Sequence, residues 1–114
     1  MARVRLSPRP GAADALAVLG QQIKTARTAR KWTATELAER IGVDRRTVAA
    51  IEAGDPAVSI GNVFNAADIV GVALFGAQDR GELGRLRREG RDRLALLPTR
   101  VDTPRTTAEP DDDF

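Results

Sequence analysis

The chain has 114 residues, of which 42% are hydrophobic, and this suffices for one compact domain with a tail. It contains no Cys, His or Tyr, so thiol nucleophiles, histidine bases and ordinary zinc sites are excluded, and we expect no enzyme, cofactor or metal. The formal net charge is +2, but four of the 16 acidic residues lie in the last six positions, so the rest of the chain carries +6. A basic body with a short acidic end is typical of proteins that bind polyanions, and many solvated surfaces are basic as well.

The two ends of the chain show no hydrophobic period. Residues 1–13 are rich in Arg and Pro and are expected to form a flexible basic arm, which either contacts phosphates or the minor groove of DNA or has no function. Residues 98–114, rich in Pro, Thr, Arg and Asp, are expected to be disordered in isolation. No stretch approaches the roughly 18 apolar residues of a membrane helix and no signal-peptide core is present, so we expect a soluble cytoplasmic protein.

Two helices are expected in the first half of the chain. The first runs from about residue 14 to residue 30, and its apolar face consists of Leu16, Leu19, Ile23 and Ala26. The second begins at Thr33, because Thr33 and Glu36 have the spacing of a capping box. Its inward face is supplied by Leu37, Ala38 and Ile41. Gly42 follows, where a left-handed residue ends a helix.

A third helix is expected immediately after Gly42. Asp44 can accept a hydrogen bond from its first turn, and Gly54 ends it. Two short helices joined by about three residues through a glycine have the pattern of a helix-turn-helix. Their steep crossing needs a small side chain, which Ala38 supplies. It also needs apolar contacts from both helices and the turn, which are Leu37, Ile41, Val43, Val48 and Ile51.

The pattern continues with a fourth helix, which Ser59 caps and Gly71 ends. Its expected inward positions are Ile60, Val63, Phe64, Ala67 and Val70. A short apolar patch follows at Val72, Leu74 and Phe75. Beyond Gly76, a fifth helix is expected to be lined by Leu83, Leu86, Leu94 and Leu97, although glycines interrupt it. The prediction is therefore an all-α bundle of four to five helices.

The segment from Leu19 to about Gly71 resembles the Xre-type, lambda-repressor-like DNA-binding domain. The resemblance is carried by LGQQI at 19–23, KWT at 31–33, ELAERIGV at 36–43 and TVAAIEAG at 47–54. We expect a DNA-binding domain over residues 14–76, followed by a C-terminal helical segment over residues 77–97 that is a candidate for dimerisation.

By this resemblance the third helix enters the major groove of double-stranded DNA. Its groove-facing positions are Arg45, Arg46 and Ala49, with Thr47 near the backbone and Asp44 at the same helix end. The inward direction of Val48 and Ile51 independently leaves the first three exposed. Arginine typically reads guanine with two hydrogen bonds. For each of Arg45 and Arg46, the alternatives are a phosphate contact or a solvated charge.

The resemblance assigns further roles around this helix. Many members have a DNA-contacting Gln where this chain has Ala34, so Thr33 and Thr35 are left as phosphate contacts. Trp32 is expected to anchor the first two helices rather than stack on a base. Arg27 and Glu52 resemble a pair that bridges the first and third helices.

The overall layout resembles HipB-like antitoxins, which repress their own operon and bind a HipA-like Ser/Thr kinase toxin. The forty or so residues after the fourth helix are too few for an effector-sensing domain. An acidic segment with one aromatic then becomes a candidate docking peptide, with a solubilising tail as the alternative. Its candidate docking residues are Asp111, Asp112, Asp113 and Phe114.

A homodimer on a palindromic operator is expected, because one recognition helix covers too few base pairs. Its expected interface is Val72, Leu74, Phe75, Leu83 and Leu86, which could instead pack within the monomer. Alternatives to the antitoxin are a stand-alone phage-type repressor without a toxin partner and a protein-interaction module that does not bind DNA.

Overall fold

The computed structural model describes residues 7–101, and the statements on structure below concern this part of the chain. Within it are five helices and no strand: α1 (Pro10–Ala29), α2 (Ala34–Ile41), α3 (Arg45–Glu52), α4 (Ile60–Val70) and α5 (Arg80–Leu94). The expected all-α architecture is confirmed. The first six residues of the expected basic arm and the whole acidic segment lie outside the described residues.

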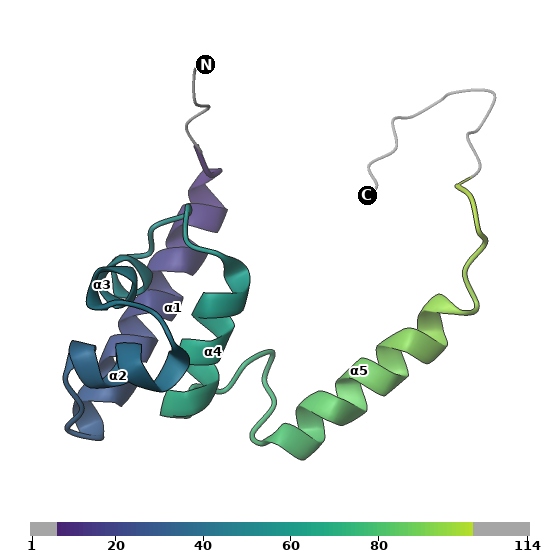
Figure 1. Ribbon diagram of the computed structural model, residues 1–114. Coiled ribbons are helices and arrows are strands. Elements are labelled where there is room, and N and C mark those ends of the chain that lie inside the picture. Colours follow the sequence, from purple (N-terminus) through teal and green to yellow (C-terminus); the bar gives the residue numbers. More distant parts are fainter. Residues whose placement is uncertain (1–6, 102–114) are drawn as a thin grey trace.

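Helices α1 to α4 form a bundle around one core (Figure 1). Ile23, Leu37 and Val48 are fully enclosed, and they come from α1, α2 and α3 respectively. The rest of the core consists of Ala38, Ile51, Val63, Ala66, Ala67 and Val70. Most of these side chains are small, so the helices approach one another closely and few large residues are needed to fill the interior.

Local capping determines where the short helices begin and end. Thr33 Oγ1 accepts from the Glu36 N–H at 3.0 Å, and the Thr33 N–H donates to Glu36 Oε1 at 2.7 Å, which completes the capping box of α2. Gly42 then takes the left-handed conformation, with φ of 75°. At the start of α4, Ser59 Oγ accepts from the Asn62 N–H at 3.2 Å. These hydrogen bonds satisfy backbone groups that a helix end leaves without partners.

Two details of the expected helices differ in the structure. Helix α1 begins at Pro10, so residues 10–13, which were expected in the arm, are helical. Proline suits a first helical position because its φ is already fixed and its missing N–H would have no partner there. Ile60, expected to point inward, is 69% exposed, and Ala66 is buried instead. Ile60 is the first residue of α4, one turn before the first core residue of that helix.

Helix α5 leaves the bundle and projects away from it (Figure 1). Asp79 caps it by accepting from the Glu82 N–H at 2.9 Å. None of its residues, all of which are described, is buried. Leu97, expected on this helix, lies beyond its end. No helix in the described part of the chain is long and apolar enough to cross a membrane.

Candidate nucleic-acid interface

The first turn of α3 is held by Asp44. Its Oδ1 accepts from both the backbone N–H and the hydroxyl of Thr47, each at 2.9 Å. Both hydrogen bonds hold the pKa of Asp44 below its usual value, and the one from the backbone N–H has the larger effect. The carboxylate therefore stays ionised at neutral pH, and its two hydrogen bonds fix the first turn of α3.

One face of α3 is buried and the opposite face is open. Val48 and Ile51 lie in the core, whereas Arg45, Arg46 and Ala49 are exposed. The exposed residues line one shallow surface hollow together with Asp44. The structure thus brings together four of the residues that were predicted to bind DNA. Ala49 has only a methyl group, so a ligand in the hollow can approach α3 between longer side chains.

The three threonines that were predicted to contact DNA differ in whether their hydroxyls can donate a hydrogen bond to a phosphate. The Thr47 hydroxyl donates to Asp44, so its proton is already used within the protein. Thr33 only accepts in its cap, and its proton remains available to a phosphate oxygen. Thr35 is exposed in the first turn of α2. Phosphate oxygens only accept hydrogen bonds, so Thr33 and Thr35 are better candidates for phosphate contacts than Thr47.

A second hollow, which the sequence did not indicate, lies beside the first. It is lined by Arg46, Thr47, Ala50, Asp55, Ala57, Val58, Ser59 and Asn62. Arg46 borders both hollows. The half-exposed amide of Asn62 offers N–H donors, so Asn62 is a further candidate for a phosphate contact. In the sequence, the position of Asn62 three residues after the capping Ser59 places it in the first turn of α4, and this signal could have identified it.

Helix α3 is tied to α1 by a nearly buried ion pair. Arg27 Nε lies 2.7 Å from Glu52 Oε2, and Arg27 Nη2 donates to Glu52 Oε1 at 3.0 Å. The side chains are only 12% and 8% exposed. Arg27 Nη1 also donates to the Trp32 carbonyl oxygen at 2.7 Å. The pKa of Arg27 is raised, chiefly by its hydrogen bond with Glu52.

Trp32 packs against the core, and guanidinium groups cover its ring. The Arg40 guanidinium carbon lies 3.9 Å from the ring centroid, and that of Arg30 lies 5.3 Å away. Both distances fall within the range of cation–π attraction. The packing of Trp32 against the core and its contacts with the two guanidinium groups favour an anchoring role for this residue.

Gly20 allows α1 and α3 to approach closely. A Cβ at this position would lie 2.6 Å from the carbonyl oxygens of both Ile51 and Glu52. Only glycine leaves room for that approach. Gly20 belongs to the LGQQI motif at 19–23, but no local pattern explains it, because the residues that it approaches are about thirty positions away in the chain.

Residues 23–75 match the family model described as helix-turn-helix, a range that extends from α1 through α4. Over this segment, which is just under half of the chain, the protein is similar to helix-turn-helix domains of the Xre or lambda-repressor-like type. The helix-turn-helix match indicates a sequence-specific DNA-binding regulator of transcription. Proteins of this class are typically not enzymes. No curated protein and no solved structure matches the chain.

Proposed function

We propose that this helix-turn-helix protein represses transcription as a homodimer that reads a palindromic operator with α3. The observation that carries the proposal is the exposed surface of Arg45, Arg46 and Ala49 at the capped start of α3. The capping of Asp44 and the ion pair of Arg27 hold this surface in one orientation. An ordered helix face is needed for base reading, since hydrogen bonds to base edges depend strongly on geometry.

The two arginines supply the specificity in this proposal. A guanidinium that donates to O6 and N7 of one guanine discriminates against other bases by about 1–3 kcal/mol. An arginine that meets a phosphate instead adds affinity without sequence preference. Thr33, Thr35 and Asn62 then position the domain through backbone contacts. A homodimer is required because palindromic half-sites lie about 34 Å apart and one domain covers only one of them.

We further propose that the regulator is the antitoxin of a type II toxin–antitoxin operon. The support is the resemblance of its layout to HipB-like antitoxins, which implies a HipA-like Ser/Thr kinase toxin as partner. The acidic segment with Asp111, Asp112, Asp113 and Phe114 is the candidate docking peptide, in which the acids steer and the aromatic anchors. The alternative is a stand-alone phage-type repressor, for which this segment only aids solubility.

DNA binding is tested on the sequence upstream of the protein's own gene, across a salt series. The wild type is expected to bind a palindrome tightly and with strong salt dependence, whereas the double variant Arg45→Ala with Arg46→Ala loses the site. Arg85→Ala is the matched control, because Arg85 is exposed on α5, away from α3. Weak binding by all three proteins, with no preferred site, would reject the repressor.

The antitoxin role is tested separately, with any kinase encoded beside the gene. The full chain is expected to bind that kinase, and deletion of residues 109–114 is expected to weaken the complex. Phe114→Ala tests the anchor alone. Unchanged affinity after the deletion would end the docking hypothesis, and the absence of any complex with the full chain would favour the stand-alone repressor.

A further inference from the structure

Helix α5 lacks the contacts that a stable helix needs. It has 15 residues, three of them glycines, and none is buried. Each interior glycine costs about 1 kcal/mol relative to alanine, and isolated helices of about 12–15 residues are marginal in water. The capping by Asp79 and one exposed ion pair between Arg85 and Glu89, at 3.3 Å, offset little of this. Contact with a partner surface would therefore stabilise the helical form of α5.

One heptad of α5, residues 83–89, has apolar a and d positions, whereas the following a and d positions hold Gly90 and Arg93. With Leu83 at position a, Leu86 takes position d and Gly90 the next a position, and Leu86 is 39% exposed. Arg80 and Arg87 then occupy e positions, and Glu82 and Glu89 occupy g positions. Around this one heptad, apolar a and d residues lie between oppositely charged e and g residues, as in a two-stranded coiled coil.

The charges distinguish the two possible orientations of a helix pair. In a parallel pair, a g residue faces the e residue of the next heptad on the other helix, so Glu82 meets Arg87 of the partner subunit. The contact occurs twice by symmetry. In an antiparallel pair, g faces g and e faces e, which would bring glutamates together on one flank and arginines on the other. Only the parallel pair is electrostatically complementary.

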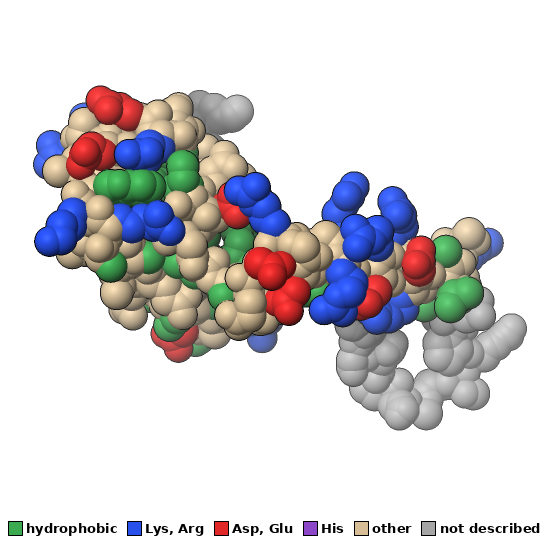
Figure 2. Space-filling view, turned by 90° about the horizontal axis from the view of Figure 1, so that it is seen from below, with side chains coloured by type: hydrophobic (Ala, Val, Ile, Leu, Met, Phe, Trp, Pro, Cys, Tyr) green, Lys and Arg blue, Asp and Glu red, His purple; other side chains and the backbone are tan. Residues whose placement is uncertain are grey.

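We propose that α5 pairs with α5 of a second copy as a short parallel coiled coil, with Leu83 and Leu86 in the seam and Glu82–Arg87 ion pairs between subunits. The inference rests on the proposed homodimer and specifies its interface and orientation. Figure 2 shows how many Lys and Arg side chains gather along the projecting helix, so an orientation that juxtaposes the basic flanks is strongly disfavoured.

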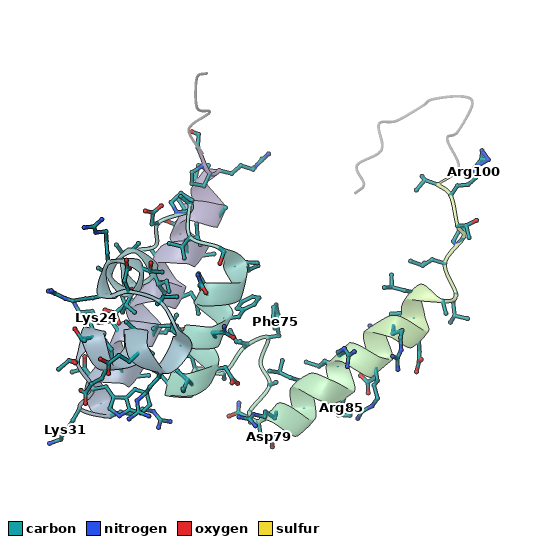
Figure 3. The ribbon with its side chains drawn as sticks, viewed as in Figure 1. Lys24, Lys31, Phe75, Asp79, Arg85 and Arg100 are labelled. Atoms are coloured by element: carbon teal, nitrogen blue, oxygen red, sulfur yellow. The ribbon has the colours of Figure 1, made fainter. Side chains whose placement is uncertain are left out.

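The apolar surface continues from α5 onto the bundle. Leu83 lines one hollow with Val72 and Leu74 at the elbow between α4 and α5. Phe75 projects from the same elbow, where Figure 3 labels it, and is 75% exposed at a φ of 56°. A positive φ is uncommon for a bulky residue, and here the ring makes an edge-to-face contact with Phe64 of α4, with the ring centroids 6.1 Å apart, while most of its surface stays exposed. These apolar residues between α4 and α5 would add to the helix–helix contact. That contact is weak toward the C-terminal end of α5, where Gly90 and Arg93 occupy the a and d positions.

A parallel pair also fits the proposed DNA contact. Both bundles would lie at the same end of the paired helices, with each α3 on the side of its bundle away from α5 (Figure 1). Two recognition helices related by a two-fold axis along α5 can then face one duplex, as a palindrome requires.

The orientation is tested by charge reversal in the full chain. Arg87→Glu replaces both intersubunit ion pairs with pairs of glutamates, and we expect the dimer dissociation constant from analytical ultracentrifugation to rise by about tenfold or more. Within one helix the new glutamate precedes Arg91 by four residues, a favourable spacing, so the helix itself is not weakened. Arg88→Glu is the matched control, since Arg88 takes the outward f position. Glu82 is left intact because the Gln78 N–H donates to its carboxylate. Equal dissociation constants for the two variants would overturn the proposal.

Cross-linking supplies a second measurement that is independent of charge. The chain has no cysteine, so Leu86→Cys and Arg88→Cys each introduce a single thiol. A parallel pair brings two copies of residue 86 together, so Leu86→Cys should form a disulfide dimer rapidly and Arg88→Cys should not. Cross-linking of Leu86→Cys only when it is mixed with Gly90→Cys would instead indicate an antiparallel pair. A variant that is monomeric yet still binds a half-site leaves the DNA-binding proposal intact, so the two proposals can fail separately.

Discussion

Arg27 and Glu52 join α1 to the end of α3 through two parallel hydrogen bonds of 2.7 and 3.0 Å. The third contact of Arg27, to the Trp32 carbonyl oxygen, extends this link to the turn between α1 and α2. One guanidinium therefore connects the three segments that set the angle of the recognition helix. Because both side chains are nearly buried, loss of either partner leaves a charge without compensation.

Glu52→Ala is expected to lower the free energy of unfolding by about 3 kcal/mol, since it leaves the Arg27 guanidinium nearly buried and without its carboxylate. Urea denaturation measures this change. The control is Glu89→Ala, which removes the exposed ion pair with Arg85 and should change stability by less than about 0.5 kcal/mol. Similar losses for both variants would mean that the Arg27 pair is no stronger than a surface contact.

Gly20→Ala is expected to destabilise the protein by about 1–3 kcal/mol, because its Cβ would press on the backbone of α3. Gly61→Ala is the control. Gly61 also lies in a helix, α4, and a Cβ there meets nothing within 4 Å. Gly61→Ala should therefore stabilise the protein by up to about 1 kcal/mol. Thermal or urea unfolding that shows the same sign for both variants would contradict the close approach of α1 and α3.

Asp44 is expected to make stability depend on acid pH. Its pKa in the folded protein is held below the usual value of 3.8, so its contribution to stability is complete above that value and is lost as the pH falls through the lowered pKa. Asp44→Asn keeps a capping oxygen but does not titrate, so its stability should fall less below about pH 4. Unfolding free energies measured from pH 7 to pH 2 provide the comparison. Asp68→Asn, on exposed α4 surface, should follow the wild type.

Thr33→Ala is expected to cost about 1 kcal/mol of folding stability, because the Glu36 N–H loses its capping partner. Thr35→Ala removes a neighbouring hydroxyl that takes no part in the capping box, and its stability should stay close to that of the wild type. Both variants should weaken DNA binding at low salt if both hydroxyls contact phosphates. A stable Thr33→Ala protein would show that the capping box contributes little to α2.

Arg45→Ala and Arg46→Ala are expected to differ in kind when tested one at a time. The arginine that reads a base should, when removed, cost about 1–3 kcal/mol and relax the preference at one position of the operator. An arginine that contacts a phosphate should weaken binding to all sequences and reduce the salt slope by about 1. Binding measured on a set of operator variants at several salt concentrations separates the two roles. Two variants with wild-type affinity and salt slope would remove α3 from the interface.

Much of the fold could be predicted because its signals are local. The capping box of Thr33 and the left-handed Gly42 each depend on residues within one helical turn. The buried face of α3 also follows from spacing alone, since Val48 and Ile51 lie three residues apart and face the same side. The exposure of Arg45, Arg46 and Ala49 then needs no tertiary information.

The sequence by itself therefore determined the helices, their caps and the exposed face of α3. Tertiary structure alone decided that Gly20 lies against the backbone of Ile51 and Glu52, that Ile60 falls outside the core, and that α5 projects from the bundle. Helical periods and caps arise from hydrogen bonds between residues three or four positions apart, which a linear pattern records. Whether an apolar residue is buried depends on which distant segments of the chain pack against it, and the local spacing of residues does not specify those contacts.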